Sequence, residues 1–230
     1  MYDRGELEAA RPLLQWDDGV SWVAHPDEGG KRASHALRGA DGVWILDPLD
    51  ATNIEALLDP LGSVAGVAVL SCWHARDADV FAERYDVAIH IPEWMDRVEE
   101  RVDAPVERYT LSPGDSAFTM LPCLPFPRWQ EVFLYDESSH TLVIPDSLGT
   151  IEPFLLGEER LGLELFRRLQ PPEQLHGLEP ERVLVGHGEP VTEDATAALQ
   201  TALEHPRREF PKAAIENGRK TVRSLLSAVR

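Results

Sequence analysis

The chain has 230 residues, of which 43% are hydrophobic and 27% are charged. This length is enough for one large domain or two small ones with a sizeable core. Its 40 acidic residues give a formal net charge of −18, and such a surface repels phosphate backbones and anionic membranes. We therefore expect neither a nucleic-acid nor a membrane partner.

Targeting and redox features predict a cytoplasmic protein. No apolar run approaches the ~20 residues that cross a bilayer, and residues 1–11 are too polar for a secretory signal. The two cysteines, Cys72 and Cys123, are too few for a disulfide framework in a chain of this size.

The first half of the chain predicts a β-rich start followed by a β-α-β-α-β stretch. Short apolar runs separated by turns indicate strands at 13–16, 20–24, 33–37, 43–46, 67–70 and 87–91. Helices are expected at 54–58 and 78–85. Because these strands are continuous apolar runs, we expect a sheet that is covered on both faces.

The second half predicts a further mixture of strands and helices. The expected strands are 106–111, 131–135, 141–144 and 182–185, and the expected helices are 158–169, 193–204 and 211–229. The Pro-rich stretch 122–127 is expected to be irregular, because proline lacks a backbone donor. We treat residues 1–230 as a single domain with a C-terminal helix at about 207–230.

Side chains that can bind a metal gather where predicted strands end. Because the carboxyl ends of strands open into a crevice in α/β folds, these residues define the candidate site. They are Cys72, His74, Arg76 and Asp77 after one strand, Asp146 after another, and His187 after a third. The sequence assigns a catalytic role to none of them.

Three segments in this order resemble parts of the metallo-β-lactamase fold. They are Gly42–Asp47, Val143–Gly149 and Val183–Pro190, the last of which contains Gly-His-Gly. The resemblance spans about residues 12–205. It implies an α/β protein with a four-layer αβ/βα sandwich of two mixed β-sheets, and a divergent member of that superfamily.

The metal-binding motif of this family is degenerate in the chain. The family pattern His-x-His-x-Asp-His falls on Cys72-Trp-His74-Ala-Arg76-Asp77. The resemblance also implies a loop histidine, but residues 121–129 contain none. Of the expected ligands, His74, Asp146 and His187 match the family pattern.

These changes imply at most one metal ion in place of two. Thiolate, imidazole and carboxylate groups all bind zinc, so the ligands of a single ion would come from Cys72, His74, Asp146 and His187. A guanidinium binds no metal and repels a divalent ion. We therefore hypothesise that Arg76 takes the place of the second ion and pairs with Asp146 and Asp77.

Each of these residues also has a purely structural interpretation. Cys72 can be an inert buried thiol, and His74 a hydrogen-bonded core histidine. His187 can cap the helix that follows it, Asp146 can stabilise its turn, and Asp77 can cap the helix at 78–85.

The sequence leaves three functions open, and with them the question of whether the protein is an enzyme. The first is a protein with a degraded dinuclear site that binds a small molecule and is not an ordinary dinuclear zinc hydrolase. The second is a mononuclear metal-dependent hydrolase of an ester, thioester or phosphoester. The third is an interaction protein that forms a homodimer through the helix at 211–229. The cofactor is accordingly either absent or one Zn²⁺.

Overall fold

The computed structural model describes residues 7–217, in which the larger of two main sheets has seven strands. Their spatial order is the chain order: β1 (Arg11–Trp16), β2 (Gly19–Val23), β3 (Ala33–Arg38), β4 (Val43–Leu46), β5 (Val64–Ala68), β6 (Ile89–Pro92) and β7 (Val106–Tyr109). Neighbours are antiparallel from β1 to β4 and parallel from β4 to β7. The sheet is therefore mixed.

The second main sheet has four strands, in the order β13-β10-β9-β8. They are β8 (Thr119–Phe126), β9 (Trp129–Asp136), β10 (Thr141–Ile144) and β13 (Arg182–Val185). Strand β10 is antiparallel to β9 and parallel to β13, so this sheet is mixed as well. A small sheet of two strands, β11 (Leu148–Gly149) and β12 (Gly162–Leu163), lies beyond it.

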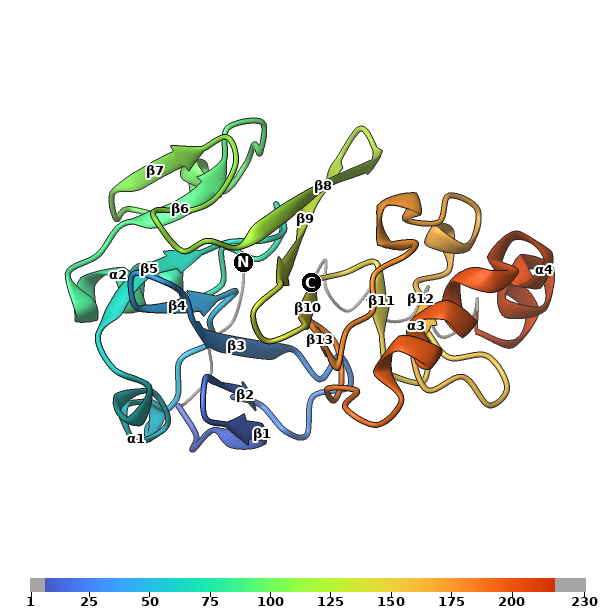
Figure 1. The fold of residues 1–230 in the computed structure, drawn as a ribbon, viewed down its shortest axis with the longest axis horizontal. Helices are drawn as coiled ribbons and strands as arrows, with labels where there is room; N and C mark the ends of the chain where they lie inside the picture. Colours follow the sequence, from blue (N-terminus) through green and yellow to red (C-terminus); the bar gives the residue numbers. More distant parts are fainter. Residues whose placement is uncertain (1–6, 218–230) are drawn as a thin grey trace.

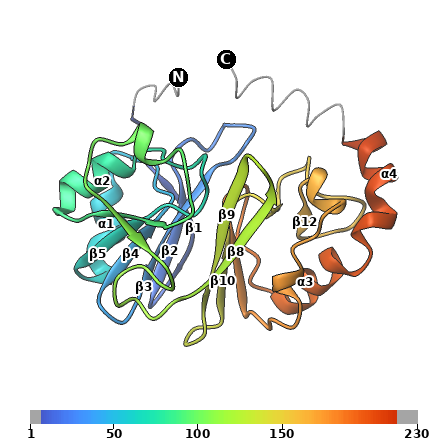
Figure 2. The ribbon, with the colours of Figure 1, turned by 90° about the horizontal axis from the view of Figure 1, so that it is seen from above.

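Helices form the two outer layers. Figure 2 shows α1 (Ile54–Leu58) and α2 (Ala78–Tyr85) outside the larger sheet, and α3 (Ala195–Glu204) and α4 (Pro206–Glu216) beyond the smaller one. Single 3₁₀ turns cover Asp59–Leu61, Glu99–Arg101, Phe166–Arg168 and Glu173–Leu175. The layers confirm the expected αβ/βα sandwich of two mixed sheets. No helix within residues 7–217 is long and apolar enough to span a membrane.

Strand β9 shows how the alternation of side chains along a strand builds two cores. Val132 and Leu134 point into the apolar cluster that also contains Trp44 of the larger sheet. Phe133 points to the opposite face and packs in the cluster that contains Leu199 of α3. Because successive residues of a strand face opposite sides, one continuous apolar run fills both layers.

The Pro-rich stretch 122–127 is largely regular, which contradicts the expectation from its sequence. Residues up to Phe126 belong to β8, which lies at an edge of its sheet. An edge strand needs backbone donors on one side only, so Pro122 and Pro125 are tolerated. The pairing with β9 shifts between Cys123 and Phe126, which places Pro125 in the irregular part of the ladder.

The prediction of a helix at 158–169 is also wrong. The chain there forms β12 and the short turn Phe166–Arg168. A Cβ atom at Gly162 would collide with the carbonyl of Phe154, so this glycine serves a close backbone approach. The guanidinium of the buried Arg168 pairs with Glu159 (Nη2–Oε2 2.6 Å). Arg168 Nη1 also pairs with Glu209 Oε2 of α4 (3.2 Å), so contacts with a distant part of the chain override local helix propensity.

The C-terminal helix begins close to the expected start at about 207 and earlier than residue 211. Helix α4 starts at Pro206, and residues 218–229 of the expected helix lie outside the described residues. Ala213 is buried against Leu156 and Leu165 of the same chain. Ile215, by contrast, is exposed.

Stability is expected to fall at acid pH because of a buried histidine of β3, His35. His35 faces Ser21 across the sheet, and its Nδ1 lies 2.7 Å from Ser21 Oγ. Burial above all, with an opposing contribution from Asp47, lowers the pKa of His35 from 6.5 to about 3. The folded state therefore binds fewer protons than the unfolded state, and stability is lost as pH falls from 6.5 towards 3.

We expect this residue to destabilise the fold by about 2 kcal/mol at pH 5 relative to pH 7. Urea unfolding of the wild type and of His35→Gln at both pH values measures the effect. The variant should be less sensitive to pH by that amount. Equal pH dependence of the two proteins would contradict the assignment.

Candidate functional site

The site forms between the carboxyl ends of two pairs of parallel strands. Strands β4 and β5 are parallel neighbours in the larger sheet, and β10 and β13 are parallel neighbours in the smaller one. The residues that follow these ends are Asp47, His74, Asp146 and His187. Because the two sheets face each other, these side chains converge between them, and the rings of the two histidines lie 5.9 Å apart.

The turn that carries His187 depends on two glycines. A Cβ atom at Gly186 would collide with the carbonyl of Pro145, and Gly188 has a φ of +111°. Around this turn, Ala33 donates its backbone N–H to Gly186 O (2.9 Å). The end of β13 is thus attached to the start of β3, and His187 is held at the seam between the two sheets.

Both histidines present the same nitrogen to one carboxylate oxygen. His74 Nε2 lies 3.1 Å and His187 Nε2 lies 3.2 Å from Asp146 Oδ1. The Nδ1 of His74 lies 2.7 Å from Asp47 Oδ2, and the Nδ1 of His187 lies 2.9 Å from the Gly30 carbonyl oxygen. Since a carbonyl only accepts, the Nδ1 of His187 carries a proton, and the same holds for His74 beside its carboxylate.

This arrangement needs additional positive charge at its centre. A neutral imidazole with a protonated Nδ1 has a lone pair on Nε2, and two such lone pairs here face the oxygen of Asp146. Protons on the Nε2 atoms or a cation among the three groups would remove the repulsion. A carboxylate behind a histidine is also the usual arrangement for a metal-binding imidazole.

The three groups fit a single metal ion. Ligand atoms of His74, Asp146 and His187 lie within 4.8 Å of one another, and they form the one such group among residues 7–217. Oδ2 of Asp146 is buried without a hydrogen-bond partner in this part of the chain. Two imidazoles and a carboxylate are suitable zinc ligands, and three protein ligands leave a position for water. A second ligand set for another ion is not present in the described residues.

Burial and neighbouring charges both act on these groups. Burial and Arg76 lower the pKa of His74, but Asp146 and Asp47 outweigh them and raise it overall. Burial alone would raise the pKa of Asp146, but His74 and His187 hold it well below its usual value. Asp146 is therefore an ionised carboxylate that attracts positive charge.

Arg76 places its guanidinium directly beside this group. Its Nη1 donates to the carbonyls of Ala33 (2.7 Å) and Asp47 (2.8 Å), which fix the position of the charge. Its Nη2 lies 3.2 Å from His74 Nε2. The guanidinium and a metal ion on Nε2 would thus compete for one atom.

Cys72 and Asp77 lie outside the group of three. The N–H of Cys72 donates to Gln130 O (2.9 Å), and its Sγ lies 3.6 Å from Arg128 O. Cys72 is therefore held by the start of β9 and the turn before it. Burial raises the pKa of its thiol, which disfavours the thiolate that a metal requires. Asp77 occupies the N-cap position of α2, but its Oδ2 accepts the N–H of Asp50 at 2.9 Å.

Two further carboxylates support the site, and their roles were not predicted. Asp47 follows β4 in a left-handed conformation (φ +47°), where it binds the Leu70 N–H (2.8 Å) as well as His74. Glu131 of β9 accepts the N–H groups of Asp146 (3.0 Å) and Ser147 (3.1 Å). Burial, aided by the charge of Asp146, raises the pKa of Glu131 to about 7. In the sequence, the charge of Glu131 next to the apolar run of β9 is the feature that could have indicated this role.

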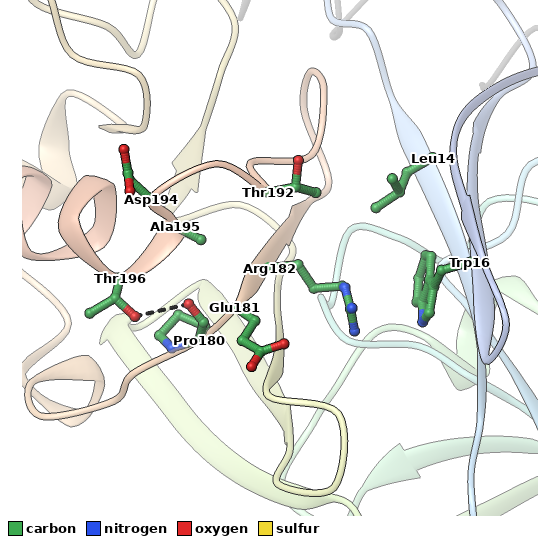
Figure 3. Close-up of a pocket in the computed structure, with 9 residues that line it drawn as sticks. All are labelled: Leu14, Trp16, Pro180, Glu181, Arg182, Thr192, Asp194, Ala195 and Thr196. Carbon is green, nitrogen blue, oxygen red and sulfur yellow. Dashed lines mark hydrogen bonds between the residues drawn. The ribbon is translucent and has the colours of Figure 1, made fainter.

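A separate cavity of about 610 Å³ contains none of the predicted site residues. It lies between β1 and the start of α3 (Figure 3), and its walls include Trp16, Arg182 and Thr196. The guanidinium of Arg182 stacks over Trp16 (5.1 Å) and donates to Thr141 Oγ1 (2.8 Å). Because the guanidinium of Arg182 already contacts Trp16 and Thr141, we take the His74–Asp146–His187 group and not this cavity as the candidate site.

Asp47→Ala should destabilise the fold by about 3 kcal/mol, because it leaves the Leu70 N–H and the His74 Nδ1–H buried without an acceptor. Asp86 has a similar backbone conformation (φ +53°) but is exposed. Asp86→Ala therefore measures the conformational part alone, about 1 kcal/mol. Urea unfolding of both variants gives the difference. Equal losses would show that the hydrogen bonds of Asp47 contribute nothing.

Comparisons with known proteins agree with this geometry at the level of the fold. No protein-family model and no curated protein matches the chain. Among solved structures, the metal-soaked Flv1 flavodiiron core of Synechocystis sp. PCC6803 is 12% identical, with a TM-score of 0.63. The match covers 89% of this chain and 62% of that one, so this chain spans less than two thirds of the flavodiiron core.

Two metallo-β-lactamases match over almost their whole length. DIM-1 is 12% identical with a TM-score of 0.62, and the match covers 88% of this chain and 99% of that enzyme. The enzyme from Pontibacter korlensis is 13% identical with a TM-score of 0.58, and the match covers 85% and 99%. At such low identities the likeness establishes architecture alone: the chain has the metallo-β-lactamase fold.

Proposed function

We propose that the protein has a degraded dinuclear site in which His74, Asp146 and His187 hold one divalent metal ion. Arg76 takes the place of a second ion. The observation that carries this proposal is the convergence of two Nε2 atoms on Asp146 Oδ1, at 3.1 and 3.2 Å, while both Nδ1 atoms are bound elsewhere.

The charges of the buried groups support one ion and oppose two. Asp47 and Asp146 are negative and Arg76 is positive, so these three groups together leave one negative charge. One divalent ion would change this net charge to +1, whereas a second would raise it to +3, a large excess of buried positive charge. Such an excess is costly in a poorly hydrated interior.

The activity that follows is hydrolysis of an ester, thioester or phosphoester by a mononuclear metal-dependent enzyme. A bound zinc ion lowers the pKa of its water towards ~7 and polarises a carbonyl or phosphoryl oxygen. Asp47 orients His74, and Glu131 positions the backbone of Asp146. Arg76 adds a fixed positive charge that favours an anionic substrate.

A second candidate function is a metal-free binder of a small molecule. The contact that favours it is the 3.2 Å approach of Arg76 Nη2 to His74 Nε2, because a guanidinium that donates to this atom replaces a metal ion there. In this case protonated or arginine-bound histidines hold Asp146, and the charged cluster binds an anionic ligand without reaction.

Metal content separates these functions from each other and from a dinuclear enzyme. Protein purified without chelator should contain about one equivalent of zinc by elemental analysis. His187→Ala should lose it, because two remaining ligands are too few. Cys72→Ala and the exposed His176→Ala should keep it. Two tightly bound equivalents, or full retention in His187→Ala, would refute the single-ion site.

The contribution of Arg76 is tested by zinc affinity. Arg76→Gln removes a positive charge next to the metal-binding atom, so the affinity for zinc should rise about tenfold. Arg84→Gln is the matched control, since the guanidinium of Arg84 pairs with Asp50 (Nη2–Oδ2 2.8 Å) and not with His74. Competition with a zinc indicator measures both variants. An unchanged or lower affinity in Arg76→Gln would exclude competition between the guanidinium and the ion.

A further inference from the structure

Three aromatic side chains form a cluster next to the candidate site, which we call the aromatic shelf: Trp73, Phe126 and Trp129. The ring centroids of Trp73 and Trp129 lie 5.2 Å apart, and those of Phe126 and Trp129 lie 6.1 Å apart. Trp73 is 39% exposed, although it directly precedes the buried ligand His74. Trp129 is buried, so the exposed part of the shelf is formed by Trp73 and the half-buried Phe126.

Two of the three rings of the shelf belong to the β8–β9 hairpin, where the family resemblance implies a loop histidine. Phe126 and Trp129 end β8 and begin β9, and Figure 1 shows this hairpin extending away from the body of its sheet. Residues 121–129 contain no histidine. Where a third imidazole would have completed another metal site, the chain instead presents aromatic rings. The indole Nε1 of Trp129 is buried and has no acceptor among the described residues.

Three arginines, Arg97, Arg101 and Arg128, lie near Cys72, the residue before Trp73. Arg97 and Arg101 lie close enough to Cys72 to affect its thiol, and the carbonyl of Arg128 is 3.6 Å from the sulfur of Cys72. Within residues 7–217, the guanidinium groups of these three arginines form no hydrogen bond or ion pair. Acidic residues such as Asp96 and Glu100 lie in the same segment, but these three guanidiniums provide hydrogen-bond donors for an anion.

We propose that the aromatic shelf and these arginines bind a small amphipathic anion, with the apolar body on the rings and the anionic group on the guanidiniums. Aromatic faces provide area for apolar groups, and exposed guanidiniums bind carboxylates or phosphates. As a description of the substrate class, this inference rests on the proposed function. The binding surface itself does not require the metal ion.

Three naphthalene compounds test the shelf without knowledge of the natural ligand. They are 2-naphthoate, 2-naphthyl phosphate and the uncharged 2-naphthalenemethanol, titrated with the full chain and followed by ligand fluorescence anisotropy. At least one anion should bind more tightly than the alcohol, and the tighter anion distinguishes a carboxylate from a phosphate ligand. Equal binding of all three, or no binding by either anion, would overturn the proposal.

Variants of the shelf separate specific binding from adsorption. Trp73→Ala should weaken the binding of the preferred anion about fivefold, because it removes the exposed ring. Arg128→Gln should weaken it about threefold and leave the alcohol unaffected. The controls are Leu111→Ala, an 82% exposed apolar residue, and Arg208→Gln, an exposed arginine on α4. If the controls weaken binding as much as the shelf variants do, the proposal fails.

Two further measurements complete the experiment. His187→Ala should lose zinc and still bind the preferred anion, so a failed metal site and a failed shelf give different results. Light scattering of the wild type and Trp73→Ala tests whether a second copy covers the rings. A dimer that Trp73→Ala dissociates would show that the shelf is a protein interface and would overturn the ligand assignment.

Discussion

Two imidazoles that have already used their Nδ1 atoms face a single buried carboxylate, and the rest of the site depends on this constraint. Asp47 and the Gly30 carbonyl fix the tautomers of His74 and His187. The fold enforces the arrangement, because the strands that deliver these groups belong to different sheets and meet where Gly186 joins β3. Without positive charge between the three groups, the site would be electrostatically unstable.

In the proposed site, Arg76 supplies positive charge beside His74 without a metal ion. Its guanidinium is held by two backbone carbonyls, so the charge is fixed and requires no metal. The site can then exist with a single ion or with protons on the histidines. The difference between these states is small in structure but decides whether the protein catalyses a reaction or only binds a ligand.

Much of the architecture was predictable because it is encoded locally. The apolar runs at 43–46 and 141–144 are buried strands as expected, and His74, Asp146 and His187 meet because each follows a strand end. The failures come from contacts that span long sequence distances. The prolines of β8 are compatible with an edge position, and the segment at 158–169 is held by contacts such as that of Arg168 with Glu209 of α4. The contacts of Cys72 with β9 and the support of Asp146 by Glu131 depend on how the sheets pack, which local patterns do not reveal.

The most direct test of the account is anomalous diffraction at the zinc absorption edge from crystals of the protein grown with zinc. The account predicts a single anomalous peak, within about 2.0–2.2 Å of the Nε2 atoms of His74 and His187 and of a carboxylate oxygen of Asp146. The Arg76 guanidinium should remain beside it. Two peaks within the crevice, or a peak on Cys72 and none on His187, would contradict the account.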